Sequence, residues 1–436
     1  MQIAVYSPVW TSRLEYACRL VLGTLLGHEP VFVSGRNEFA SVQGIRINYS
    51  HEEVEGSLQV IPHTLLFEEN IREFTPEVNH WKGIPVLFSR HAPSYLPFDP
   101  FAAAFWMASR YEEYLPFAPD RHDRFTADQS LASRNGFLGE PVVHLWANSL
   151  AAAIRQFYPQ YEVRPHAFSF QPTIDVDIAW AYLHRSLLRS SGGFARSLAG
   201  GRAKELTERW KVLRGKQHDP YDQFEVLLAL HREHKLNATW FVEVGKHGKY
   251  DKNIDPRNKA FRKLIAGLAA GNEVGLHPSY ASHLDEKAVL QEKNQLENIT
   301  GKPIHKSRQH FLRLRFPYTY ETLIKYGFTE DYSMGFPDQP GFRAGLCVPF
   351  PWFNLEKNRI ENLTIVPFGI MDVTLSKYMN LSAKDALVRC ITLIDRVKQV
   401  NGRFVSIWHN QPAMPWKTKD WFELYWQLVR YYAGDE

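Results

Sequence analysis

Residues 172–180 read Pro172-Thr173-Ile174-Asp175-Val176-Asp177-Ile178-Ala179-Trp180, which places two carboxylates two positions apart in an apolar, β-prone stretch. In a strand, side chains at positions i and i+2 point to the same face, and their Cα atoms are about 6.5–7 Å apart. Two like charges on an apolar face are costly unless a cation, a shared proton or a functional cleft compensates them. The pair Asp175 and Asp177 is therefore the first candidate for a metal or acid–base site.

The chain after this stretch alternates between short apolar segments and amphipathic ones. Strands are expected at 168–176, 238–244, 273–277, 305–312, 328–334, 363–368 and 403–409. Helices are expected at 222–235, 258–270, 285–299, 317–326, 383–399 and 417–433. This alternation predicts an α/β fold, a distorted (β/α)7-type barrel over residues 165–436. The active site of such a fold lies at the carboxyl ends of its strands.

Residues 1–150 predict a small α/β accessory domain ahead of the barrel. Strands are expected at 3–6, 31–33, 45–49, 58–61 and 84–88, and helices at 12–27 and 100–115. Asp99 is the expected N-cap of the second helix, with Pro100 at its first position. The polar residues 119–135 are expected to form a loop, and no catalytic constellation emerges in this domain.

Composition narrows the class of protein. The 436 residues carry a net charge of only +4, which argues against a nucleic-acid partner. The cysteines Cys18, Cys347 and Cys390 form no CxxC pair, so a zinc ribbon or a redox motif is not expected. The amino terminus lacks the pattern of a signal peptide, and no apolar run reaches the ~18 residues of a spanning helix. These features predict a cytoplasmic location.

The segment 184–216 stands out by its charge, with nine Lys or Arg residues against Glu205 and Glu208. One interpretation is peripheral contact with an anionic membrane surface or an acidic glycan. The other, which we favour, is a solvated helical insertion between the first two strands of the barrel.

Polar side chains gather where the expected strands end. His277 follows the strand at 273–277, and Pro278 forces a turn after it. Arg308 and His310 would share one face of the strand at 305–312, and His409 ends the last strand. A lone histidine is more often structural than a ligand, but three at strand ends beside an Asp pair indicate a shared site.

These motifs resemble those of the polysaccharide deacetylases, the NodB-homology proteins of carbohydrate esterase family 4. Residues 173–177 are similar to the family's Thr-Phe-Asp-Asp-Gly, and residues 271–277, Gly-Asn-Glu-Val-Gly-Leu-His, to its Gly-His-Glu-Ile-Gly-x-His. The Arg308 strand and the helix ending near residues 326–328 are similar to the third motif, and residues 407–409 to the last. The resemblance covers about residues 168–436. The part before it resembles the accessory domain of a divergent branch.

The resemblance implies a metal-dependent hydrolase that removes N- or O-acetyl groups from a sugar or glycan. It implies Asp175 as general base, Arg308 as the group that orients it and His409 as general acid. A divalent metal, with zinc as the first choice, would be held by Asp177, His277 and His310. Ser279 and Arg343 are the expected substrate contacts, although a structural salt bridge explains Arg343 at least as well.

The chain departs from the family pattern at two places. The adjacent Asp pair of the family is here separated by Val176. The family's second ligating histidine, four residues after the first, is replaced by Ala281. His310 is our candidate for the missing ligand, and His283 is the rival.

Two other functions remain open on the sequence alone. A glycosyltransferase could use the Asp-x-Asp pair to hold a metal and a nucleotide-sugar, but it leaves the three histidines unexplained. A non-catalytic carbohydrate-binding or assembly protein on a deacetylase scaffold is favoured by Ala281 and disfavoured by the retained Asp175 and His409.

Overall fold

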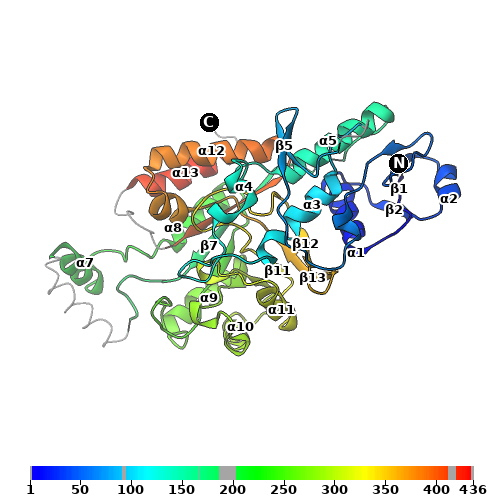
Figure 1. Cartoon of the computed structure of the whole chain (residues 1–436). Helices are drawn as coiled ribbons and strands as arrows, with labels where there is room; N and C mark the ends of the chain where they lie inside the picture. The colour runs from blue at the N-terminus through cyan, green and yellow to red at the C-terminus, as the bar shows by residue number, and fades with distance from the viewer. Residues whose placement is uncertain (1, 91–94, 165, 186–202, 411–418, 434–436) are drawn as a thin grey trace.

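The computed structural model describes residues 2–90, 95–164, 166–185, 203–410 and 419–433 (Figure 1). A four-stranded sheet lies near the amino terminus and a nine-stranded sheet spans the rest of the chain. The predicted mixed α/β fold is confirmed. The domain boundary near residue 150 stays a prediction.

The four-stranded sheet has the order β2-β1-β3-β4, and all its pairings are parallel. Its strands are β1 (Ile3–Tyr6), β2 (Pro30–Val33), β3 (Ile45–Asn48) and β4 (Leu58–Gln59). Helix α1 (Ser12–Cys18) continues as a π-helix over Arg19–Leu25, and α2 (Arg36–Ser41) follows β2. These elements lie close to the predicted ranges because their apolar side chains follow the strand and helix periods.

Helix α3 (Pro100–Ala108) begins as predicted, with the Asp99 carboxylate accepting hydrogen bonds from the backbone of Phe101 and Ala102. It ends earlier than predicted, because Arg110 adopts a left-handed φ of 54° that no α-helix can continue. The rest of this part comprises a 3-10 helix at Tyr111–Tyr114, the hairpin β5 (Val78–Trp81) and β6 (Ile84–Leu87), α4 (Leu131–Arg134) and α5 (Val142–Phe157).

The large sheet has β7 near its centre. In sheet order its strands are β12 (Phe350–Asn354), β13 (Arg359–Ile365), β11 (Glu330–Asp331), β10 (Lys306–Ser307), β9 (Glu273–Leu276), β8 (Thr239–Val242), β7 (Ser169–Val176), β15 (Arg403–His409) and β14 (Ile370–Met371). Every pairing is parallel except that of β12 with β13. No pairing joins β12 to β14 among the described residues, so closure into a seven-unit barrel stays a prediction.

One predicted strand is much shorter in the structure. The expected strand at 305–312 ends at Ser307, and a 3-10 helix begins at His310. Arg308 and His310 therefore do not share a strand face. Strand β9 lies beside β8, and Gly275 of β9 faces the ring of Phe241 in β8. A Cβ at Gly275 would lie 2.5 Å from that ring, so only glycine allows this close approach.

Helices lie on two sides of the large sheet in the view of Figure 1. Helices α12 (Ala383–Gln399) and α13 (Lys419–Ala433) lie together on one face, with α8 (Phe224–Glu233) near them. On the opposite side in this view lie α9 (Lys259–Gly271), α10 (Glu286–Thr300) and α11 (Tyr318–Lys325). Strand β8 is buried over its whole length: Trp240 contacts Phe224 of α8, whereas Phe241 belongs to a separate apolar cluster with Val405 and Ile407 of β15.

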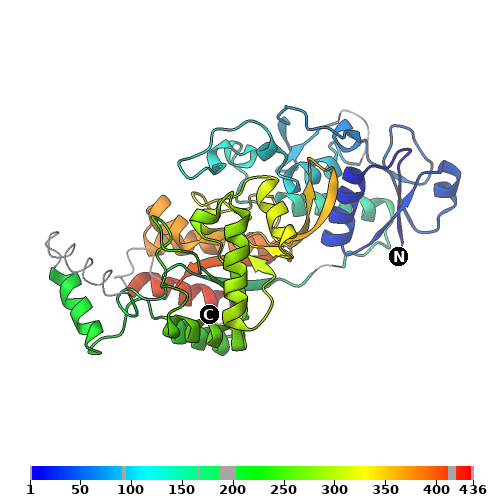
Figure 2. The ribbon, with the colours of Figure 1, turned by 90° about the horizontal axis from the view of Figure 1, so that it is seen from below.

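The two sheets share one hydrophobic core. Helix α1 packs on the β12–β13 hairpin, where the Tyr16 ring lies 5.2 Å from that of Phe353 and its hydroxyl donates to the carbonyl of Pro351. Figure 2 shows the small sheet at one end of the molecule and α7 (Ala203–Leu213) at the other.

The basic segment at 184–216 is described only in part. Helix α7 is solvent-facing for most of its length, whereas residues 186–202 lie outside the described residues. The membrane or glycan contact therefore stays a prediction. Among the described helices, none combines the length and apolar character that crossing a membrane requires.

Candidate metal and acid–base centre

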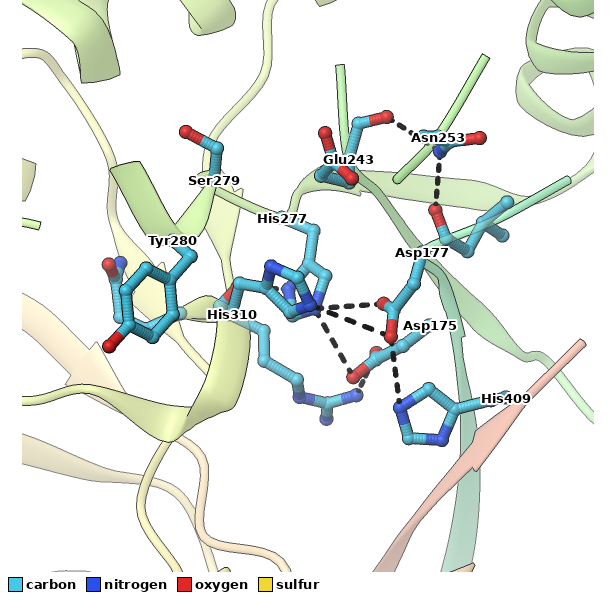
Figure 3. A network of polar contacts seen from close by, with 12 residues as sticks. Asp175, Asp177, Glu243, Asn253, His277, Ser279, Tyr280, His310 and His409 are labelled. Carbon is cyan, nitrogen blue, oxygen red and sulfur yellow. Dashed lines mark hydrogen bonds and ion pairs between the residues drawn. The ribbon is translucent and has the colours of Figure 1, made fainter. Parts of the chain in front are cut away.

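The predicted site residues meet at the carboxyl ends of neighbouring strands. Asp175 lies in β7, where its backbone pairs with His409 of β15 and with Phe241 of β8. Asp177 follows β7, and His277 follows β9. Since β10, β9, β8, β7 and β15 run parallel and adjacent, their ends bring these side chains to one edge of the sheet (Figure 3).

Asp177, His277 and His310 form a set of three potential metal ligands. One ligand atom from each lies within 4.8 Å of the others. The Nε2 of His277 lies 3.3 Å from Oδ1 of Asp177, and the Nε2 of His310 lies 3.6 Å from Oδ2 of the same carboxylate. Two imidazoles and one carboxylate are donors that zinc and similar divalent ions accept. The residues present therefore fit a divalent metal.

The rings of His277 and His310 are each oriented by a contact at Nδ1, the nitrogen that faces away from Asp177. The Nδ1 of His277 is hydrogen-bonded to the backbone carbonyl of Arg308. The Nδ1 of His310 lies 3.0 Å from Oδ1 of Asp251. An Nδ1 proton donated to such an acceptor selects the tautomer that leaves the Nε2 lone pair facing the site. The rings are thus positioned as metal ligands require.

Asp175 is held on one side only. Its Oδ1 accepts a hydrogen bond of 2.7 Å from Nη1 of Arg308, which is fully buried. Its Oδ2 points toward the ligand set, 3.8 Å from Nε2 of His277. Arg308 is itself anchored through Nε to the backbone carbonyl of Tyr332 and lies over the Phe241 ring. The second carboxylate oxygen is consequently available to the cleft.

His409, at the end of the neighbouring strand β15, approaches the carboxylate of Asp177. Its Nδ1 lies 2.7 Å from Oδ1 of Asp372, and its Nε2 lies 3.6 Å from Oδ2 of Asp177. The second oxygen of Asp372 accepts the backbone N–H of His409. One aspartate therefore fixes both the ring and the backbone of His409.

The electrostatics of the site favour charged forms. Burial opposes ionisation of Asp177, but His310 and His409 hold the pKa of its carboxyl well below the ordinary value. Burial likewise opposes protonation of the two histidines, and the carboxylates outweigh it. Asp177 raises the pKa of His310 to about 10, and Asp372 with Asp177 raises the pKa of His409 to about 9.

These groups open onto a cleft of 520 Å³. Asp175, Asp177, His277, His310 and His409 all line it. Its other walls include apolar side chains and a cationic segment from the first part of the chain. The apolar lining comprises Phe311, Leu312, Pro337, Met371 and Val373. A cleft of this size lies within the usual range of small-molecule sites.

Three predicted site residues lie elsewhere. Ser279 is buried and both its hydroxyl and its backbone N–H donate to Glu292, so the expected substrate contact is not seen. The His283 ring faces Asp123, with Nε2 3.1 Å from Oδ2, and it does not line the cleft. Arg343 is buried against Glu113, which corrects the expected substrate contact in favour of the salt bridge.

The sequence did not indicate Asp251 and Asp372, whose carboxylates contact the rings of His310 and His409. Asp251 lies in the connection after β8, and Asp372 directly follows β14, a strand that was not predicted. A third carboxylate, Glu243, is fully buried near the site. Burial raises the pKa of its carboxyl well above the ordinary value. Neither periodicity nor spacing marks these residues, because their partners are distant in the chain.

A protein-family model, described as a family of unknown function (DUF7033), matches residues 3–159. No curated protein matches the sequence.

Several solved structures are similar to part of the chain. A putative polysaccharide deacetylase from Mycobacterium smegmatis is 14% identical, with a TM-score of 0.40, and the match covers 62% of this chain and 89% of that one. A polysaccharide deacetylase from Bacillus cereus is 11% identical, with a TM-score of 0.31, covering 60% and 87%. A CE4 family pseudoenzyme from Bacillus anthracis is 12% identical, with a TM-score of 0.28, covering 62% of each chain.

Proposed function

We propose that this protein is a metal-dependent hydrolase that removes N- or O-acetyl groups from a sugar or glycan. One observation carries the proposal. A carboxylate and two imidazoles, Asp177, His277 and His310, share one cleft with a carboxylate and a histidine that face them from either side. Metal-assisted acyl hydrolysis needs this combination of ligand set, proton acceptor and proton donor.

Asp177, His277 and His310 would hold the metal. When bound there, a divalent ion such as zinc supplies a water of lowered pKa and polarises the acyl oxygen. His310 takes the place that Ala281 leaves vacant in the family pattern. It reaches the site from the loop after β10, with Asp251 fixing the ring.

Asp175 acts as the general base in this proposal. Its Oδ2 faces the ligand set and takes the proton of the attacking water. Arg308 binds Oδ1, so the charge that stabilises the carboxylate does not block the reactive oxygen. Only a proton moves in this step, from water to Oδ2.

His409 acts as the general acid. In the metal-free site Asp372 and Asp177 outweigh burial and raise the pKa of the ring to about 9. Asp372 holds Nδ1, so that Nε2 faces the cleft. Nε2 then donates its proton to the leaving amine nitrogen or alcohol oxygen as the acyl bond breaks. The base, Asp175, lies in β7 and the acid, His409, ends β15. In this proposal the base serves the attacking water and the acid serves the leaving group.

A non-catalytic glycan-binding protein is the second candidate, and Ala281 is the observation that favours it. A binding protein needs neither the Asp372–His409 pair nor the Arg308–Asp175 pair in its cleft. A nucleotide-sugar transferase explains only the two aspartates and leaves the histidines unused.

Acetate release from acetylated amino-sugar oligomers tests the proposal. We expect release by the zinc-loaded protein and its loss in Asp175→Asn, with metal content unchanged because Asp175 is not among the ligands. Asp255→Asn, which changes an exposed carboxylate paired with Arg257, is the matched control and retains full activity. A folded, zinc-loaded protein that releases no acetate from N- and O-acetylated substrates would overturn the proposal.

A further inference from the structure

The outer wall of the cleft comes from the chain ahead of the large sheet. Arg121, His122 and Arg124 line the cleft together with the residues of the candidate site. They lie in the polar segment that the sequence predicted to be a plain loop. This segment faces Lys377 and Tyr378, which end a π-helix at Thr374–Tyr378 on the other side of the cleft.

Several contacts attach this segment to the loops that carry the site. The Nε of Arg313 donates to the carbonyl of His122 at 2.8 Å, and the His122 ring lies 3.2 Å from the Tyr280 hydroxyl. Nη1 of Arg124 donates to the carbonyl of Phe311, the residue after His310, at 2.9 Å. His122 and Arg124 are both buried. The segment is therefore a fixed wall of the cleft.

Most charges in the cleft are compensated. Asp175 pairs with Arg308, Asp177 lies among three histidines, and Arg124 pairs with Asp120 at 2.7 Å. Arg124 also reaches across the cleft, where Nη2 lies 3.3 Å from the Tyr378 hydroxyl.

Two cations at the mouth lack such compensation. Arg121 and Lys377 line the cleft and are exposed, and the described residues provide no ion pair to either. Arg121 belongs to the segment before the large sheet and Lys377 to the π-helix on the other side, so a ligand in the cleft would lie between the two cations. A metal at the inner end would add further positive charge. The cleft thus combines an electropositive mouth with apolar walls.

We propose that the substrate is an acidic glycan, in which a carboxylate on a sugar beside the acetylated one is bound by Arg121 and Lys377. The inference rests on the proposed deacetylase function, which it deepens by naming the substrate class. The planar fork of Arg121 matches a carboxylate in a bidentate manner, and Lys377 adds a point charge. The apolar side chains deeper in the cleft receive the sugar ring faces.

Binding to two tetrasaccharides tests the inference. Hyaluronan tetrasaccharide alternates glucuronate with N-acetylglucosamine, whereas chitotetraose contains N-acetylglucosamine alone. For the zinc-loaded protein we expect the acidic probe to bind on the order of tenfold more tightly at low ionic strength, with the gap closing as salt is added. Titration calorimetry measures both.

The variant Arg121→Gln/Lys377→Gln should reduce this preference to less than about threefold. Its matched control is Lys384→Gln/Arg389→Gln, which removes one lysine and one arginine from exposed positions on α12. The control should keep the wild-type preference. Equal binding of both probes by the wild type, or an unchanged preference in the cleft variant, would overturn the inference.

The two proposals fail in different ways. Acetate release from chitotetraose without any preference for the acidic probe would contradict the acidic-glycan inference and support the deacetylase proposal. The opposite result is a salt-sensitive preference that depends on Arg121 and Lys377, without acetate release from any probe. It would contradict the deacetylase proposal and support a binding site for acidic glycans.

Discussion

The Arg308–Asp175 pair and the Arg343–Glu113 pair are both buried, yet they serve different ends. Arg343 binds Glu113 through two nitrogens, and Arg110 binds the same carboxylate and Glu112. This cluster joins the turn after α3 to the segment between β11 and β12. Arg308 instead binds one oxygen of Asp175 and leaves the other facing the cleft.

The surroundings of the two pairs explain the difference. The Arg343 guanidinium lies over the Phe336 ring in a sealed interior, so its charge serves only to bind the two parts of the chain. The Arg308 pair continues into Asp177 and the imidazoles of the cleft. A buried ion pair therefore does not mark a site by itself. It does so when one partner retains a free oxygen beside other titratable groups.

The largest expected effect separates the two pairs by activity. Asp175→Asn should lower kcat about 10²- to 10⁴-fold, the usual contribution of a general base. Glu113→Gln should leave the kcat of the folded protein within about twofold, because Glu113 contacts nothing in the cleft. Steady-state acetate release measures both. Equal losses in the two variants would erase the distinction.

The second prediction concerns stability. Glu113→Gln should lower the free energy of unfolding by about 3–5 kcal/mol, because it leaves the buried Arg343 without its carboxylate. Denaturant unfolding at neutral pH measures this. Glu52→Gln breaks the exposed pair with Arg36 and serves as control, with a change below about 1 kcal/mol. A loss of unfolding free energy as small as that of the control would show that the Arg110–Glu113–Arg343 cluster does not hold the turn after α3 to the segment around Arg343.

The third prediction concerns the carboxylate behind His310. Asp251→Asn should weaken zinc binding about 10- to 100-fold, because the ring loses the charged partner of its Nδ1. Competition with a chromophoric chelator measures the affinity. Zinc affinity unchanged in this variant would show that the ring needs no such support.

The last prediction concerns the dependence of metal affinity on pH, an effect of about tenfold for a change of one pH unit. A ligand histidine must be neutral, and His310 without metal has a pKa of about 10, so each metal bound below that pH displaces a proton. The affinity for zinc should therefore rise by about tenfold per pH unit between pH 6 and 8. A flat profile over that range would show that His310 carries no proton to lose.

Much of the site could be predicted because it follows apolar strands. Asp175, Asp177, His277 and His409 lie at or after strands whose periodicity is plain in the sequence. His310 was reached for the wrong local reason, since it begins a 3-10 helix and shares no strand face with Arg308. The prediction nevertheless placed it at the correct edge of the sheet.

The rest could not be predicted because it depends on tertiary contacts. Asp251 and Asp372 act through histidines 59 and 37 residues away, and no spacing rule links such pairs. The cleft wall at Arg121 comes from a segment with no periodicity. Glu113 and Arg343 are 230 residues apart, so only packing shows that Arg343 is structural.

The central claim is that His310, not His283, completes a metal site with Asp177 and His277. The most direct test is zinc content after equilibrium dialysis of the wild type, His310→Ala and His283→Ala. Both variants remove a partly or fully buried imidazole paired with an aspartate, so they are matched. We expect near-stoichiometric zinc in the wild type and in His283→Ala, and little in His310→Ala. Full zinc in His310→Ala would contradict the account.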